Sequence, residues 1–131
     1  MICHDLNGKR LWRDGLVAHI GSLVTAGAGE RIALACFSAG LQCYTSAGSN
    51  TGRISILEAC RLAAISFDGR LFLVAGLTNR LFLVDDKGRI LCDERVESPI
   101  VALALGALGK DAVLAFADGR VAGYVLTAAS F

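Results

Sequence analysis

The chain has 131 residues, of which 54% are hydrophobic, and its 13 basic and 12 acidic side chains give a net charge of +1. This length suits one domain with a substantial core, and the near-balance of charge argues against a nucleic-acid partner or an anionic membrane surface. The longest apolar run, residues 100–108, is much shorter than the roughly 18 residues that a membrane-spanning helix needs.

The N-terminal segment and the cysteines indicate a compartment. Residues 1–13 are interrupted by His4, Asp5, Asn7 and Gly8 and lack the continuous apolar stretch of a secretory signal. The 5 cysteines are odd in number and contain no C-x-x-C pair, which favours free thiols in a reducing environment over disulfides or a zinc site. We therefore expect a cytoplasmic protein that holds no metal and no other cofactor.

The first predicted element is a hairpin turn followed by a short strand. Residues 5–9 have the sequence DLNGK, which matches DDKGR at 85–89. Asp and Gly at these positions are typical of tight hairpins. We expect residues 10–13 to form the outer strand of a sheet whose inner strands come from elsewhere.

Three stretches then repeat one pattern of strand, turn, strand, turn and strand, at residues 16–46, 61–86 and 100–125. Their expected first strands, aligned with one another, are 16–20, 61–65 and 100–104. The first and middle stretches continue into expected fourth strands at 53–59 and 90–95. The abundant alanines favour helix by intrinsic propensity, but Gly106, Gly109 and the spacing of the turn signals favour strands. We therefore predict an all-β fold.

A unit of roughly 40 residues made of short strands is typical of a β-propeller blade, and propellers usually close with about 4 to 8 blades. On this interpretation the chain is a single domain, 1–131, of three four-stranded antiparallel blades. The blades lie at about 16–59, 61–95 and 100–126, and the strand at 9–14 completes the last one.

Two segments resemble repeats of the β-propeller superfamily that includes WD-repeat and quinoprotein-like proteins. DLNGKRLW at 5–12 is similar to the hairpin between the third and fourth strands of a quinoprotein-type repeat, and ISFDGRL at 65–71 is similar to the first turn of a WD-type blade. The chain departs from both patterns, because no Trp-Asp dipeptide ends a third strand and Trp12 is the single tryptophan. The resemblance implies a propeller fold without quinone chemistry, since these motifs encode blade geometry rather than an activity.

The number of blades has a consequence for assembly. Three blades would leave flat apolar faces at both ends of the arc, and such faces need a cover. Two copies related by a two-fold axis would close a six-bladed ring, of which each chain forms half. In this homodimer, residues 10–13 of one copy would pair with residues 120–125 of the other. The alternative is that the chain is a fragment of a longer propeller protein.

No residue constellation predicts a reaction. His4 and His19 are expected to be buried packing residues, the carboxylates at 85–97 indicate a solvated edge, and residues 26–30 lack the Lys and Ser/Thr of a phosphate loop. We expect a non-catalytic module that binds a protein or a small ligand; the alternative is a hydrolase- or lyase-type enzyme acting at the channel mouth. Analogy with the fold suggests as contacts at that mouth Trp12, Arg13, Asp14, Ser38, Leu77, Thr78, Asn79, Glu97, Ser98 and Asp118.

Overall fold

The structure, a computed structural model, describes residues 1–15, 19–38 and 40–126. These residues form strands β1 to β13, joined by turns, and contain no helix. The all-β prediction is therefore confirmed. In the described part of the chain, no helix has the length and apolar character that a membrane crossing requires.

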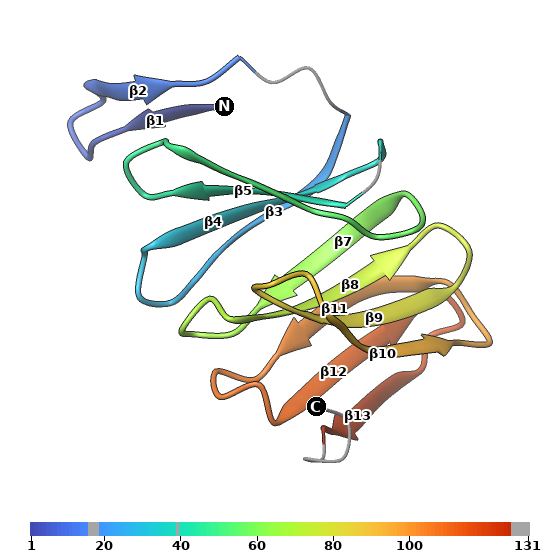
Figure 1. The fold of residues 1–131 in the computed structure, drawn as a ribbon. Helices are drawn as coiled ribbons and strands as arrows, with labels where there is room; N and C mark the ends of the chain where they lie inside the picture. The colour runs from blue at the N-terminus through green and yellow to red at the C-terminus, as the bar shows by residue number, and fades with distance from the viewer. Residues whose placement is uncertain (16–18, 39, 127–131) are drawn as a thin grey trace.

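The strands form four antiparallel sheets that follow one another in chain order (Figure 1). The N-terminal hairpin consists of β1 (Ile2–His4) and β2 (Arg10–Arg13). The first sheet contains β3 (Ile20–Thr25), β4 (Arg31–Cys36), β5 (Leu41–Thr45) and β6 (Asn50–Ile54). The central sheet contains β7 (Cys60–Ile65), β8 (Leu71–Gly76), β9 (Arg80–Asp85) and β10 (Ile90–Arg95). The last sheet contains β11 (Ile100–Leu105), β12 (Asp111–Phe116) and β13 (Val121–Val125).

The strand positions repeat every 40 residues. The second strands of the three sheets begin at Arg31, Leu71 and Asp111, so each start lies 40 residues after the previous one. The N-terminal hairpin keeps the same spacing, because β2, β6 and β10 begin at residues 10, 50 and 90. β1 and β2 therefore hold the third and fourth positions of a four-stranded sheet.

The first strand of the first sheet differs from the prediction. It is β3 and begins at Ile20, whereas the sequence placed it at 16–20, where residues 16–18 lie outside the described part. Ile20, Cys60 and Ile100 are the equivalent starting residues, and in each sheet the pairing with the second strand is interrupted by a bulge just after them. The alignment of 16–20 with 61–65 was therefore wrong.

The fourth strand of the first sheet also differs. The predicted strand at 53–59 is wrong, because β6 begins at Asn50 and ends at Ile54. The preceding turn closes at Gly48, whose backbone N–H donates to Thr45 O at 3.0 Å and whose φ is +87°. Gly52, just before the predicted strand, lies within β6.

β2 has a partner within its own chain. It pairs antiparallel with β1 through Ile2↔Arg13, Cys3↔Trp12 and His4↔Arg10. The prediction had left residues 10–13 without a neighbouring strand of the same chain. The last sheet, for its part, is three-stranded, with β13 at its outer edge.

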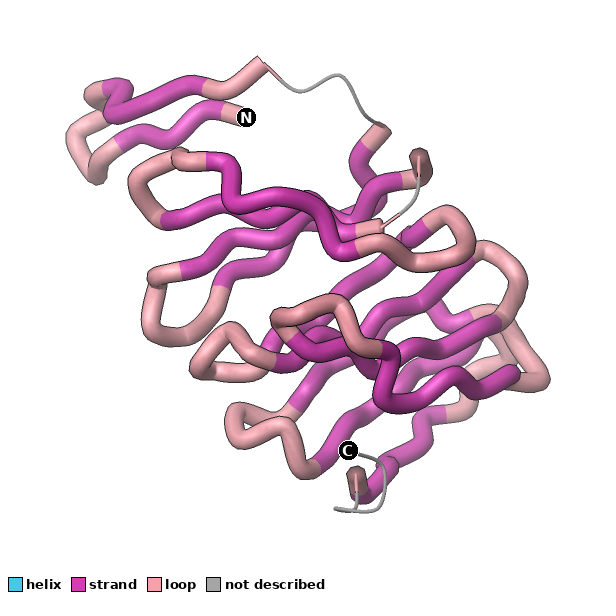
Figure 2. Tube along the Cα trace, in the orientation of Figure 1, coloured by secondary structure: helices cyan, strands magenta, loops and turns pink. Residues whose placement is uncertain are grey.

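The core lies on both faces of the central sheet, because alternate side chains of a strand point to opposite faces. One face turns Phe72, Val74, Phe82 and Val84 toward the first sheet. The other turns Leu73, Ala75, Leu81 and Leu83 toward the last sheet. Each large side chain buried in this way contributes about 1.5–3 kcal/mol, so the stacking of sheets seen in Figure 2 is held mainly by apolar contact.

Hydrogen bonds between neighbouring sheets fix the spacing between them. The backbone N–H of Ala63 donates to Ser22 Oγ at 3.0 Å, which joins β7 to β3. The backbone N–H of Phe67 donates to Ala107 O at 2.9 Å, which joins the central and last sheets. Gly21 lets β3 approach β7 closely, because a Cβ there would stand 2.3 Å from Arg61 O.

Candidate functional site

The loops predicted to contact a ligand lie at one end of the sheets. In the first and last sheets, the turn between the second and third strands bonds to the segment that precedes the first strand. Phe37 N–H donates to His19 O at 3.0 Å, and Ala117 N–H donates to Pro99 O at 2.8 Å. In the central sheet, Val96 N–H donates to Asn79 O at 2.8 Å.

The predicted contact residues fall into three groups. Asn79 and Glu97 belong to the central sheet, with Leu77, Thr78 and Ser98 beside them in sequence. Asp118 lies in the turn before β13, where its carboxylate accepts from Arg120 Nε at 3.1 Å. The remaining four belong to the N-terminal hairpin or the first sheet, and they are Trp12, Arg13, Asp14 and Ser38.

Asp14 and Ser38 come together in a hollow of about 480 Å³ beside the first sheet. Tyr44 forms part of its floor and is 2% exposed. Burial, together with the nearby Asp14 carboxylate, raises the pKa of Tyr44 to about 12. The hydroxyl therefore stays protonated at neutral pH and acts as a hydrogen-bond donor. The other lining residues are Gly15, His19, Ile20, Cys36, Gln42, Asn50 and Arg53.

His19 differs from the prediction in its surroundings. It was expected in the middle of a strand and buried, but it precedes β3 and is exposed. His4, which was also expected to be buried, is exposed at the end of β1. The shift follows from the corrected start of β3 at Ile20, because the 40-residue spacing makes His19 equivalent to Ala59 and Pro99 in the connecting segments. Exposure at the hollow makes this imidazole available to solvent.

Trp12 rests on the first sheet rather than standing free at the end of the molecule. Its indole Nε1–H donates to Ser46 O at 3.0 Å, and its ring lies against Gly48. The 40-residue spacing aligns Trp12 with Gly52 and Cys92. Trp12 thus fastens the hairpin to the turn between β5 and β6.

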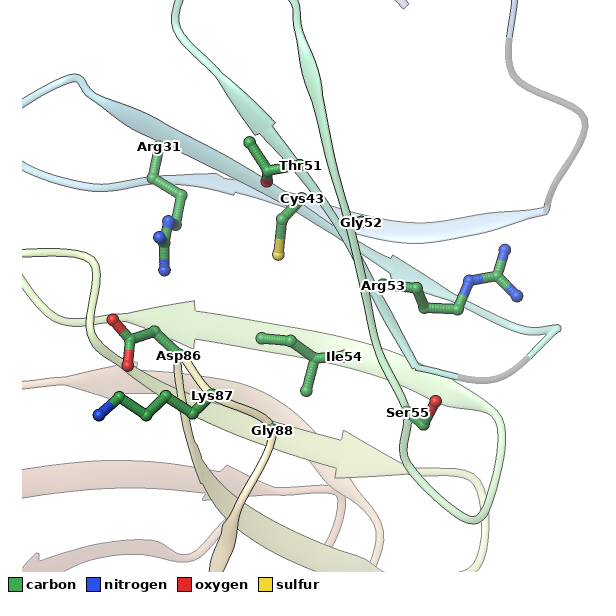
Figure 3. A pocket seen from close by; sticks show the side chains of 10 residues that line it. All are labelled: Arg31, Cys43, Thr51, Gly52, Arg53, Ile54, Ser55, Asp86, Lys87 and Gly88. Atoms are coloured by element: carbon green, nitrogen blue, oxygen red, sulfur yellow. The ribbon is translucent and has the colours of Figure 1, made fainter.

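A second hollow, a groove of about 380 Å³, lies between the first and central sheets (Figure 3). Its walls are residues 51–55 of the first sheet, with Arg31 and Cys43, and the turn at 86–88 of the central sheet. Arg31 and Asp86 face each other across the groove, whereas Arg53 extends away from it (Figure 3). Arg31 also donates through Nη1 to Gly69 O at 2.9 Å, which holds its guanidinium in place.

This groove was missed by sequence reasoning, although the repeat contains a signal for it. Between the central and last sheets the equivalent positions carry Leu71, Leu83, Leu91 and Cys92, of which the last three belong to the apolar cluster there. Between the first and central sheets the same positions carry Arg31, Cys43, Thr51 and Gly52. Replacement of leucines by shorter or charged side chains leaves the space open.

The chemistry of the groove is that of a polar binding surface. Burial raises the pKa of the Cys43 thiol, and the charge of Arg31 offsets only part of that effect. Since the thiolate is the nucleophilic form, Cys43 is a poor nucleophile at neutral pH. Within the described ranges, no group of three or more His, Cys, Asp or Glu side chains is arranged to hold a metal ion.

Among the described residues, the outward face of the last sheet exposes apolar side chains. Val113 is 48% exposed and Val121 is 71% exposed. The residues 40 positions earlier, Leu73 and Leu81, are 1% and 9% exposed because the last sheet covers them. The same face of the same repeat is thus core in the central sheet and surface in the last sheet.

Comparison with known proteins assigns a fold. No protein-family model matches the chain, so none assigns WD or quinoprotein repeats, and no curated protein matches it. Among solved structures, 665 chains match, and a fold this common hosts unrelated functions. One of them is hydrazine synthase of Kuenenia stuttgartiensis, a β-propeller-containing protein, with a TM-score of 0.67 and 15% identity. The match covers 74% of this chain and 29% of that protein, so the likeness shows a β-propeller-like fold alone.

Proposed function

We propose that this chain is a non-catalytic interaction module that joins a second copy of itself to form a closed propeller ring. Each copy supplies half of the ring. The observation that carries the proposal is the exposed apolar face of the last sheet, where Val113 and Val121 hold positions that are buried in the central sheet. Apolar faces of this kind mark interaction sites in proteins that stay in solution.

A second copy fits this face because the chain carries both halves of the same contact. Inside the chain, the outward face of one sheet always packs on the opposite face of the next sheet, as Leu73 and Leu83 do at the last sheet. The face of the first sheet that points away from the central sheet is the face on which a preceding sheet would pack. Leu23, in its innermost strand β3, is 53% exposed on that face. The equivalent Ala63 is 8% exposed because the first sheet covers it.

The symmetry of the assembly follows from these two faces. The last sheet of one copy would pack on the first sheet of the other, and a two-fold axis would make both contacts at once and close the ring. Three sheet positions from each copy give six blades, which lies within the usual range for propellers. Further blades supplied by a longer chain would cover the same faces, and the mass of this chain in solution separates the two arrangements.

The test is the mass of the 131-residue chain by light scattering across a dilution series. The ring predicts a mass near twice 13.7 kDa. Val121→Asp would bury an unpaired carboxylate at the contact, so we expect at least about 100-fold weaker association. Leu57→Asp is the matched control, because Leu57 is 87% exposed in the segment between the first and central sheets, and it should leave the mass unchanged. A folded wild-type monomer at every concentration would overturn the proposal.

A further inference from the structure

β1 and β13 are equivalent strands of the repeat. Residues 2–4 of β1 lie 120 residues, or three repeats of 40, before residues 122–124 of β13. In the central sheet the third and fourth strands pair Leu83 with Cys92 and Phe82 with Asp93. Shifted by the repeat, this register sets Gly123 opposite Trp12 and Ala122 opposite Arg13.

In the free chain those places beside β2 are already taken. Cys3 lies opposite Trp12 and Ile2 lies opposite Arg13. Each residue of β1 thus stands where the repeat would set a residue of β13. Both strands need the same edge of β2, and only one of them can pair with it at a time.

The hairpin covers only part of the free face of the first sheet. Met1 packs against the cluster of Leu34, Cys36 and Tyr44, which are 1–2% exposed. In the inner strand β3, Ile20 packs against the same cluster, but Leu23 stays 53% exposed. The uncovered part, around Leu23, lies where the first and second strands of a further sheet would pack. In the last sheet, these first and second strands are β11 and β12.

We infer that β1 is a substitute strand, which β13 of a second copy displaces from β2 when the ring assembles. This inference rests on the proposed function, because the second copy supplies the displacing strand. β11 and β12 of that copy fill the space beside Leu23, and the tight turn after β12 delivers β13 to the edge of β2. β13 pairs with β12 at five positions, whereas β1 pairs with β2 at three and is interrupted by a bulge. The longer strand, anchored in its own sheet, displaces the shorter one.

Until then β1 protects the edge of β2. An unpaired edge presents free backbone N–H and C=O groups and invites pairing with any extended chain. By occupying β2, β1 makes association depend on the apolar face and the strand edge together. The partner that fits both is another copy in the same register.

The first test is an intermolecular cross-link. Arg13→Cys together with Ala122→Cys, in a Cys3→Ser background, should form a disulfide between copies, because the register sets these residues directly opposite. A covalent dimer should appear on a non-reducing gel under mild oxidation. Arg13→Cys with Tyr124→Cys is the matched control: Tyr124 lies on the same strand face two residues out of register, and this pair should not cross-link.

The second test locks β1 onto β2. Met1 and Asp14 exchange backbone hydrogen bonds in both directions, so the next pair, Ile2 and Arg13, is a non-hydrogen-bonded pair whose side chains lie close. Ile2→Cys with Arg13→Cys, again with Cys3→Ser, should therefore form a disulfide within the chain. We expect the oxidised form to dimerise at least about tenfold more weakly than the same protein after reduction.

The outcomes separate this inference from the proposed function. A covalent dimer from the 13/122 pair, with weaker dimerisation of the locked form, supports the displacement of β1. A wild-type dimer that gives no 13/122 cross-link, or that forms equally well with β1 locked, overturns the displacement and leaves the ring intact. A wild-type monomer at every concentration overturns both.

Discussion

At the scale of single residues, each turn between a third and a fourth strand has one side-chain oxygen that accepts hydrogen bonds from backbone N–H groups of the turn. In the central sheet this acceptor is Asp85, which is 7% exposed and accepts hydrogen bonds from the backbone N–H groups of Lys87 and Arg89 and from Arg89 Nε. Burial alone would raise the pKa of Asp85, but these donors hold the pKa below its ordinary value. Asp5 accepts from two backbone N–H groups in the hairpin turn, and Thr45 takes the position in the first sheet.

Asp85→Asn should lower the free energy of unfolding by about 1–3 kcal/mol at pH 7, because a buried set of charge-assisted hydrogen bonds is lost. The pKa of Asp85 is lower in the folded than in the unfolded chain. Its contribution is therefore present above the unfolded value near 4 and is lost as the pH falls through the folded value. Urea unfolding at pH 7 and near pH 3 should show the difference between wild type and variant shrinking in acid.

Asp5→Asn is the matched control for that substitution. Asp5 holds the same place in its turn but is less buried, and neither of its two bonds comes from an arginine side chain. Its loss should cost clearly less than the loss of Asp85. Equal costs for the two variants, or a cost for Asp85→Asn that does not depend on pH, would contradict the role given to the buried carboxylate.

At the scale of elements, the N-terminal hairpin is joined to the first sheet by few contacts. Trp12 is the main one, through its bond to Ser46 O and the close approach of its ring to Gly48. A Cβ at residue 48 would stand 2.5 Å from Trp12 Cδ2, whereas one at the equivalent Gly88 would meet nothing within 4 Å. Both glycines have nearly the same φ, +87° and +84°.

Gly48→Ala and Gly88→Ala should therefore separate backbone strain from contact with the ring. Each should lose about 1–2 kcal/mol, because alanine is strained at positive φ. Only Gly48→Ala should also move the hairpin, and since Trp12 is the single tryptophan, its emission should shift to longer wavelength and become easier to quench with acrylamide. Identical emission and quenching in the two variants would show that Trp12 does not rest on Gly48.

The elements also show which parts of the fold could be predicted from the sequence. The strand at 90–95 was predicted with its observed bounds, because Asp85 and Gly88 mark the turn before it. The strand at 53–59 was wrong because Gly48 and Gly52 both adopt positive φ and composition does not say which of them closes the turn. The groove at Arg31 was missed because it requires knowing which side chains of two sheets face each other. The outward face of the last sheet could be foreseen, since three sheets in a row leave two ends uncovered.

At the scale of the whole molecule, the proposed ring would link stability to assembly. The central sheet is covered on both faces within the chain, whereas the last sheet has one face covered and the other exposed. A second copy that binds the folded form and not the unfolded chain stabilises the folded form in proportion to the logarithm of its concentration. The melting temperature of the assembled ring must therefore depend on protein concentration, while that of a single chain must not.

A tenfold rise in chain concentration should stabilise the dimer by about 1.4 kcal/mol relative to two unfolded chains. For a dimer of this size, that raises the melting temperature by roughly 2–4 °C per decade of concentration. Circular dichroism melts over two decades would measure the slope, and Val121→Asp, which should remain a folded monomer, would give a slope of zero. Val113→Ala should keep a slope but melt at a lower temperature, because it removes apolar area from the contact without burying a charge. A flat wild-type series would contradict the linkage between folding and ring closure.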